Sequence, residues 1–159
     1  MSKKIQWFTH VVINAPLKKV WEYSIDITKI PEFHPLVSKV DLISGKTKRE
    51  TGVSYRCNIT EGKQKGNCIE KVTEIINYEK FVTVIPEDSW GISNMFKNYT
   101  AETLFSEIDD KSTEISIIAY YNTAGIKAKF INFLAKRKMR QQAYDTLRGI
   151  KKKIEEYLK

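Results

Sequence analysis

Six segments that alternate apolar and polar residues follow one another through the middle of this chain, separated only by short turns. These segments cover residues 37–44, 52–60, 65–76, 80–86, 94–108 and 112–122. Alternation with a period of two is typical of strands with one buried face. Spacers this short join antiparallel neighbours, because a parallel connection needs a crossover of a dozen residues or more. The pattern therefore predicts an antiparallel meander.

A strand and a short helix precede the meander. Residues 5–13 are rich in β-branched and aromatic side chains and predict the first strand. Asn14 can cap a helix, and Pro16 suits its first turn. Side chains at helical spacing then follow at Leu17, Val20, Trp21 and Ser24. The predicted helix runs through Asp26 and stops before Pro31, because the residue before a proline is pushed out of the α region.

A single long helix, residues 126–158, closes the chain. Its apolar stripe consists of Met139, Ala143, Leu147, Ile150, Ile154 and Leu158. Its early part carries apolar residues nearly all round, at Phe130, Ile131, Phe133 and Leu134. Other elements must cover this early part, or it must meet an apolar partner.

The expected order is one strand, two short helices, six strands and the long helix, an α+β arrangement in a single domain over residues 1–159. A sheet of seven antiparallel strands has one face to bury, and the closing helix is the only element large enough to cover it. A curved sheet wrapped around one helix tends to leave a hollow between them. Such hollows bind small ligands.

Composition excludes several classes of protein. A hydrophobic fraction of 42% argues against disorder. No window approaches the roughly 18 apolar residues of a membrane span, and the start lacks the apolar core of a secretory signal, so a cytoplasmic protein is expected. Two cysteines and two histidines, without CxxC or HxxxH spacing, predict no metal and no cofactor.

Several stretches resemble the SRPBCC or START-like superfamily, the helix-grip fold, which includes polyketide cyclase/dehydrase and lipid-transport proteins. The resemblance rests on I-N-A-P-L-K-K-V-W at 13–21, Asp26, and I-P-E-F-H-P-L-V at 30–37. Weaker matches are residues 70–74, 111–115 and 147–151. Many relatives carry Trp where Phe33 stands, and the coenzyme-Q-binding branch has Tyr where Ile30 stands, so the branch stays open.

The stretch I-P-E-F-H-P-L at 30–36 is interpreted as the second short helix or a turn that braces the closing helix. Its prolines fix the corner by locking φ, and Phe33 and Leu36 are expected to pack under the long helix. Strand alternation places this corner, both short helices, and the turns at 61–64, 87–93 and 123–126 at one end of the sheet. That end, with His34 and Trp90, is expected to be the mouth of the cavity, although Trp90 could instead fold back onto the core.

The turn at Gly62-Lys63 allows the register of one hairpin to be predicted. If these two residues form the loop, partners have numbers that sum to 125. The pairs are Cys57 with Cys68, Tyr55 with Glu70, and Val53 with Val72. All point to the more apolar face, which is assigned to the cavity. In the first strand, the alternate residues from Trp7 to Ile13 face inward, and His10 faces out.

The inward carboxylate of Glu70 needs a donor, and Tyr55 beside it is the candidate. Together they could hold a ligand hydroxyl or transfer a proton; a register error of one residue would instead place Glu70 in water. The expected ligand-contacting residues are Phe33, His34, Tyr55, Cys57, Glu70, Trp90, Tyr99, Thr103, Ile117, Tyr121, Phe130 and Leu134. Hydroxyls among apolar residues suit a largely apolar ligand with a few polar groups.

Three functions remain open. The favoured one is binding or transport of a hydrophobic small molecule such as a lipid, isoprenoid quinone or polyketide-like aromatic. The resemblance also permits a polyketide cyclase or dehydratase using Glu70, Tyr55 and His34, although no catalytic motif supports an enzyme. The third is contact with RNA, since one branch of the resembled family acts on ribosomes, or with an anionic membrane.

The net charge of +8 is concentrated in residues 127–159 and supports the third reading. The residues expected to meet an anionic partner are Lys136, Arg137, Lys138 and Arg140. A plain solvated helix face is the alternative. Ligand identity and oligomeric state are not predicted.

Overall fold

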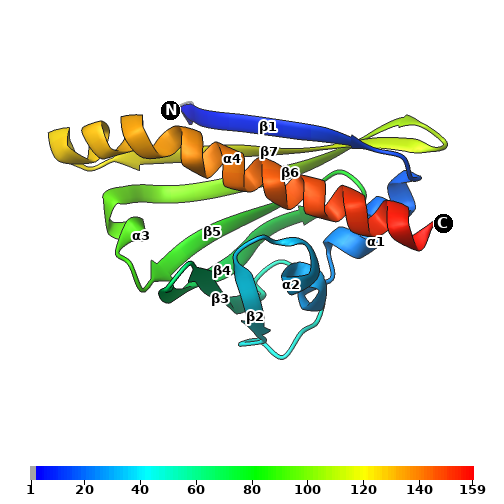
Figure 1. Ribbon diagram of the computed structural model, residues 1–159, viewed down its shortest axis with the longest axis horizontal. Helices are drawn as coiled ribbons and strands as arrows, with labels where there is room; N and C mark the ends of the chain where they lie inside the picture. The colour runs from blue at the N-terminus through cyan, green and yellow to red at the C-terminus, as the bar shows by residue number, and fades with distance from the viewer. Residues whose placement is uncertain (1–2) are drawn as a thin grey trace.

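The computed structural model describes residues 3–159 and confirms the expected order of elements, to which it adds a one-turn helix between the fifth and sixth strands. The strands are β1 (Ile5–Ile13), β2 (Val37–Asp41), β3 (Ser54–Glu61), β4 (Gln64–Ile76), β5 (Lys80–Asp88), β6 (Phe96–Asp109) and β7 (Ser112–Thr123). The helices are α1 (Leu17–Ser24), a 3₁₀ turn at Ile27–Lys29, α2 (Ile30–Phe33), α3 (Ile92–Met95) and α4 (Gly125–Tyr157). One antiparallel sheet has the order β1-β7-β6-β5-β4-β3-β2 (Figure 1).

The predicted register of the β3–β4 hairpin is confirmed. Cys57 pairs with Cys68 and Tyr55 with Glu70, around the loop at 62–63. Val53 lies just before β3, and its carbonyl accepts from the Val72 N–H at 2.9 Å. The inner face of the sheet therefore carries the side chains that the alternation assigned to it.

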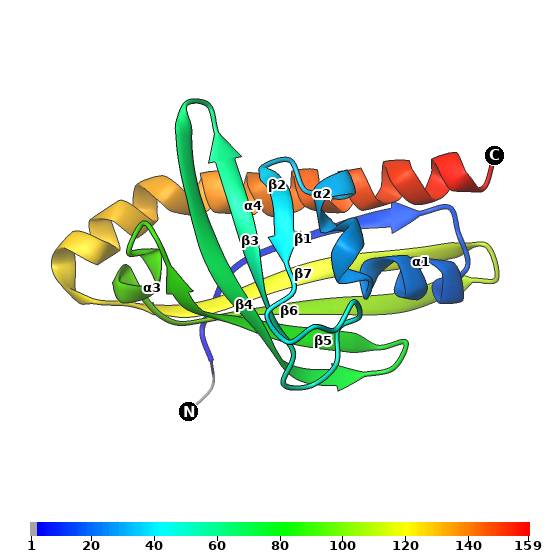
Figure 2. The same cartoon turned by 90° about the horizontal axis from the view of Figure 1, so that it is seen from below.

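The sheet reaches α4 from both of its edges. On one side α4 runs along β1, as Figure 1 shows. On the other side the tip of the β3–β4 hairpin meets the helix, where Lys138 Nζ lies 2.6 Å from Glu61 Oε1 (Figure 2). The predicted stripe of α4 is buried at Leu147, Ile150 and Ile154, whereas Leu158 at the helix end is exposed.

The early part of α4 presents a different face from the expected one. Ala128 is buried, and Ile131 and Met139 pack against the inner face of the sheet. The prediction that Phe130 and Leu134 face the cavity is wrong, since they are 65% and 63% exposed. Where apolar residues surround a helix, periodicity does not indicate which stripe is buried; here the stripe with Ala128 and Ile131 faces the sheet.

Three expectations about the short helices are corrected. Asn14 does not cap α1: the N-cap is Pro16, without a side-chain hydrogen bond, and the Asn14 N–H donates to Glu155 at 2.9 Å. Helix α1 ends at Ser24, and Pro31 stands in the first turn of α2 instead of stopping α1. The fixed φ of proline suits a first helical turn.

Helix α1 also lies at the opposite end of the sheet from the expected mouth. Trp21 packs on Tyr78 and Phe105, with ring centroids 5.7 and 5.0 Å away, and Thr113 Oγ1 donates to the Ala15 carbonyl at 2.9 Å. The reason is directional: β1 is antiparallel to β7, so it ends beside the β6–β7 turn. Only the residues after α2 run back toward the tip of the β3–β4 hairpin, where the Thr60 N–H donates to the Leu36 carbonyl at 2.9 Å.

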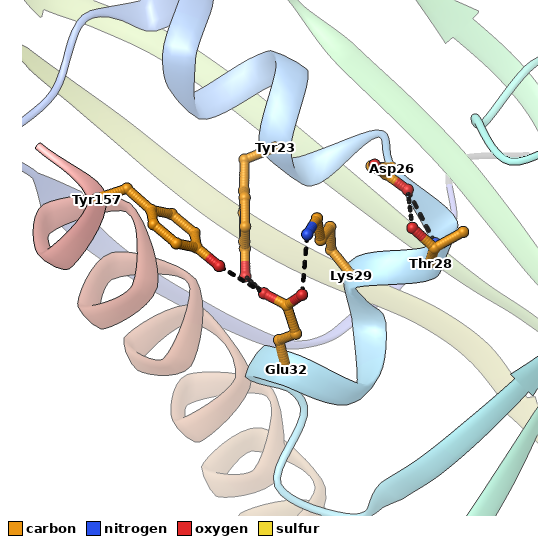
Figure 3. A network of polar contacts seen from close by, with 6 residues as sticks. All are labelled: Tyr23, Asp26, Thr28, Lys29, Glu32 and Tyr157. Carbon is orange, nitrogen blue, oxygen red and sulfur yellow. Dashed lines mark hydrogen bonds and ion pairs between the residues drawn. The ribbon is translucent and has the colours of Figure 1, made fainter.

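The C-terminal part of α4 is held against α1 and α2 by the carboxylate of Glu32. Glu32 accepts from Lys29 Nζ at 2.9 Å, from Tyr157 at 3.0 Å and from Tyr23 at 3.1 Å (Figure 3). The hydrogen bond from Lys29 is the main cause that lowers the pKa of Glu32, with Tyr157 and Tyr23 adding to it. Phe33, as expected, is buried at this junction, where its backbone touches α4 at Gly149. Leu36 is only partly buried.

Candidate functional site

Most of the predicted ligand-contacting residues lie on the inner face of the sheet. Tyr55, Cys57, Thr103 and Tyr121 are buried there, and Glu70, Tyr99 and Ile117 are partly exposed. Strand pairing brings them together: Thr103 lies opposite Ile117, while the Tyr99 ring stacks on the Tyr121 ring at 5.5 Å. The inner wall thus mixes hydroxyls with apolar side chains, as the alternation indicated.

A chain of hydrogen bonds ends at Glu70. The Tyr55 hydroxyl donates to Glu70 Oε2 at 2.5 Å and accepts from Arg49 Nε at 3.2 Å. Arg49 is buried, donates to the Ser24 carbonyl, and lies 4.5 Å from the centroid of the Phe81 ring. Burial raises the pKa of Tyr55, and Glu70 adds to this while Arg49 opposes it. Tyr55 therefore stays a proton donor at neutral pH, and Glu70 is oriented by it.

His34, at the end of α2, is close enough to Glu70 for the carboxylate charge to act on it. Its Nδ1 accepts from the Leu36 N–H at 3.2 Å, which leaves the ring proton on Nε2. Burial lowers the pKa of His34 below its ordinary value of 6.5, and the charge of Glu70 partly opposes this. A neutral imidazole near a carboxylate can donate a hydrogen bond to that carboxylate or to a ligand.

The depressed pKa of His34 predicts a loss of stability in acid. The unfolded chain takes up a proton near pH 6.5, whereas the folded chain does so only at lower pH, so the free energy of unfolding falls as pH drops below 6.5. His34→Asn keeps an acceptor for the Leu36 N–H but does not titrate. Its free energy of unfolding, measured with urea from pH 7.5 to 5, should therefore fall less steeply than that of the wild type. His10→Asn, at the exposed second histidine, is the matched control; equal slopes in both variants would contradict this role of His34.

Two thiols stand beside the same carboxylate. Cys57 and Cys68 are buried free thiols, and their sulfurs and a Glu70 oxygen lie within 4.8 Å of one another. A hydrogen bond with Cys68 raises the pKa of the Cys57 thiol, and burial raises it further. By residue type and distance, these three are a group that could hold a metal ion.

Trp90 lies over the mouth end of β4 and is 41% exposed. A Cβ on Gly66 would be 2.5 Å from two atoms of the indole ring, so the ring lies against this glycine on the side to which Cys68 and Glu70 also point. The Asp88 carboxylate holds the segment by accepting from the N–H groups of Trp90, Ile92 and Ser93. Trp90 thus lies at the predicted end of the sheet, with its ring against Gly66.

A pocket of about 730 Å³ opens at this same end. It lies where β5 and β6 separate, because their pairing stops at Val84 and Thr100. Its lining includes Lys3, Lys4, Lys97, Ile85, Tyr99 and Tyr121. Helix α4 contributes no residue to this pocket, so it differs from the expected hollow between sheet and helix. Tyr99 and Tyr121 are the predicted site residues that line it.

Two residues near the site, Arg49 and Trp7, were not among the ligand-contacting residues predicted from the sequence. Arg49 lies in the irregular loop before β3, where no periodicity indicates burial. Trp7 was expected to face inward, and it does, but its Nε1 is a buried nitrogen without a hydrogen-bond partner within residues 3–159. It packs in a cluster with Phe96, Ala119 and Tyr121. A buried unpaired donor is costly and can be satisfied by a ligand oxygen.

Comparison with known proteins decides the family. A family model described as polyketide cyclase/dehydrase and lipid transport matches residues 7–155. The chain belongs to this family. This family and the related folds below place it in the START-like (SRPBCC) superfamily that the motifs at 13–37 indicated. No curated protein sequence matches the chain.

Solved structures of this START-like fold superpose on almost the whole chain. A norcoclaurine synthase mutant from Thalictrum flavum is 14% identical, with a TM-score of 0.76 over 99% of this chain and 98% of that one. The Zhui aromatase/cyclase from a Streptomyces species is 12% identical, with a TM-score of 0.72 over 99% and 97%. A START superfamily protein from Mycobacterium smegmatis is 12% identical, with a TM-score of 0.71 over 95% and 97%. At these identities the likeness shows the fold.

Proposed function

We propose that this START-like protein binds a hydrophobic small molecule that carries a few polar groups, such as a lipid, an isoprenoid quinone or a polyketide-like aromatic. The observation that carries the proposal is the pocket of about 730 Å³ at the mouth end, within the size range of small-molecule sites. Tyr99 and Tyr121 supply aromatic wall, and burial of apolar ligand surface supplies the affinity, at roughly 25 cal/mol per Å² before costs.

Polar groups of the pocket suit the polar part of such a ligand. At the rim, Lys3, Lys4 and Lys97 can meet a carboxylate, phosphate or carbonyl oxygen. Burial raises the pKa of Tyr99 and the neighbouring Tyr121 adds to this, so the Tyr99 hydroxyl stays protonated at neutral pH and can donate to a ligand oxygen. We expect the ligand body to lie along Tyr99 and Tyr121.

Native mass spectrometry of the protein purified without organic solvent tests this function. We expect an adduct of a few hundred daltons, the mass of a ligand that fills a pocket of this size. Tyr99→Ala, which removes part of the wall, should lose most of the adduct. Tyr144→Ala, on the outer side of α4, is the matched control and should keep it. If the wild type carries no adduct and also binds none of a panel of added lipids and quinones, the proposal is excluded.

A cyclase or dehydratase is the second candidate, and the hydrogen-bonded chain Arg49–Tyr55–Glu70 on the inner face of the sheet favours it. The hydrogen bond from Tyr55 orients the Glu70 carboxylate, which can act as a proton acceptor near a bound substrate. Glu70→Gln separates the two functions. If the wild type converts the ligand, and Glu70→Gln binds it without converting it, the protein is an enzyme. If the ligand is recovered chemically unchanged from both the wild type and Glu70→Gln, the protein is a binding protein.

The start of α4 carries a separate proposal, that this end of the protein meets an anionic membrane. Its side chains Ile126, Phe130, Phe133 and Leu134 are between 63% and 87% exposed. Residues 124–144 contain six Lys or Arg and no Asp or Glu, which complements anionic head groups. The exposed aliphatic side chains of Ile126 and Leu134 favour a membrane over RNA, because they can insert among lipid chains but make no stacking contact with a base. No helix within residues 3–159 is long and apolar enough to cross a bilayer.

Co-sedimentation with vesicles tests the membrane contact. Binding to phosphatidylserine-containing vesicles should exceed binding to pure phosphatidylcholine and should fall with added salt. Phe133→Ser should weaken it about tenfold, because burying a phenylalanine contributes about 1.5 kcal/mol or more. Ile108→Ser, at an equally apolar exposed position on β6, should change nothing. Binding to RNA with none to vesicles would overturn the proposal.

A further inference from the structure

Cys57, Cys68 and Glu70 form a compact set of metal-ligand atoms that binding of an apolar molecule does not explain. Strand pairing puts Cys57 directly opposite Cys68, and Glu70 follows two residues later on the same face of β4. Their ligand atoms all lie within 4.8 Å of one another. The set is invisible as a spacing motif, because two strands contribute to it and the hairpin register creates it.

We propose that Cys57, Cys68 and Glu70 bind a zinc ion whose fourth coordination position stays open. Thiolates are soft ligands that select zinc over magnesium or calcium. Three protein ligands with one open position are the arrangement of reactive zinc sites. With Zn–S bonds of about 2.3 Å and Zn–O bonds of about 2.1 Å, tetrahedral ligand atoms lie roughly 3.5 Å apart. Small rotations of these side chains therefore suffice to close the site around an ion.

The charges around the site fit a loaded ion. Zinc displaces the two thiol protons to solvent, so the ion, two thiolates and one carboxylate sum to a single negative charge. Buried Arg49 supplies one positive charge through Tyr55. The Tyr55 hydroxyl donates to Glu70 Oε2, which leaves Oε1 free to bind the metal. This hydrogen bond also orients the carboxylate, as hydrogen-bond partners of metal ligands commonly do.

The fourth position belongs to a small molecule and not to His34. His34 Nδ1 accepts from the Leu36 N–H, so its other ring nitrogen carries a proton and cannot bind a metal in this geometry. A water or a ligand oxygen can take the open position. Glu70 is partly exposed, whereas both cysteines are buried, so the opening is on the Glu70 side.

Cobalt titration of the full chain, stripped with a chelator and kept reduced, tests the site. We expect one Co²⁺ per chain, with the intense visible bands of a tetrahedral ion and a thiolate charge-transfer band, and displacement by Zn²⁺. Cys57→Ser should weaken Zn²⁺ binding about 100-fold or more and reduce the charge-transfer band. Glu70→Gln should weaken binding but keep that band, because both thiolates remain.

Lys71→Ala is the matched control, since its exposed side chain points to the opposite face of β4. It should bind Zn²⁺ like the wild type. Circular dichroism of each stripped variant checks folding, and Glu70→Gln keeps the test decisive if a cysteine variant unfolds. A folded wild type that gives only weak octahedral Co²⁺ bands, or cysteine variants with unchanged Zn²⁺ affinity, would overturn the zinc site. Neither result depends on whether the apolar ligand binds.

Discussion

Gly149→Ala is expected to lower the free energy of unfolding by about 2 kcal/mol, although alanine is the better helix former. A Cβ at this position would lie 2.0 Å from the Phe33 carbonyl oxygen and 3.1 Å from the Phe33 Cα. These are backbone atoms of α2, so no side-chain rotation relieves the overlap and α4 must lift away. Overpacking of this kind costs about 3 kcal/mol, and the better helix propensity returns only about 1 kcal/mol.

Urea unfolding of Gly149→Ala beside Lys152→Ala measures the effect. Lys152 is exposed on the same part of α4, so its replacement should change the free energy of unfolding by less than about 0.5 kcal/mol. If Gly149→Ala were as stable as the wild type or more stable, the close packing of α4 on α2 would be refuted.

The hairpin register and the inner face of the sheet were predictable because short-range rules determine them. A two-residue loop at 62–63 allows one register, and side-chain alternation then assigns every residue of β3 and β4 to a face. The meeting of Tyr55 with Glu70 and of Cys57 with Cys68 follows directly. The predicted donation from Tyr55 to Glu70 is confirmed as well. The exposure of these residues and the hydrogen bond from Arg49 to Tyr55 do not follow, because they depend on the elements packed above the hairpin.

The orientation of the first turns of α4 was not predictable from periodicity. Apolar residues lie around the whole helix there, so no stripe is favoured, and tertiary packing buries Ala128 while Phe130 and Leu134 turn outward. Phe130 and Leu134 were misassigned for this reason. The position of α1 could have been deduced, because an antiparallel first strand must end beside the β6–β7 turn.

Buried Arg49 could not be identified from sequence, because it lies in an irregular loop whose neighbours are decided by the fold. The pocket between β5 and β6 escaped for a related reason. It exists because their pairing stops early, at Val84 and Thr100, while both strands continue. Alternation marks where a strand is, but it does not mark where two neighbouring strands separate.

Arg49→Met is expected to lower the free energy of unfolding by about 3 kcal/mol, near the lower limit for losing two hydrogen bonds to a charged group at about 1.5 kcal/mol each. Methionine fills similar space but donates nothing, so the Ser24 carbonyl and the Tyr55 oxygen lose a donor. The contact of the guanidinium with the Phe81 ring is lost as well. The partial exposure of Glu70 keeps the expected cost at this lower limit. Urea unfolding at pH 7 measures it.

A double-mutant cycle with Glu70→Gln identifies which part of this cost is electrostatic. If Arg49 balances the Glu70 charge through Tyr55, removing that charge should restore part of the stability lost in Arg49→Met, with a coupling of about 1 kcal/mol. Lys71→Ala, next to Glu70 but on the outer face, should show no coupling with Arg49→Met. If the stability losses of Arg49→Met and Glu70→Gln are additive, Arg49 acts only through its local hydrogen bonds and its packing on Phe81. The charge of Glu70 is then stabilised by solvent at the mouth and not by Arg49.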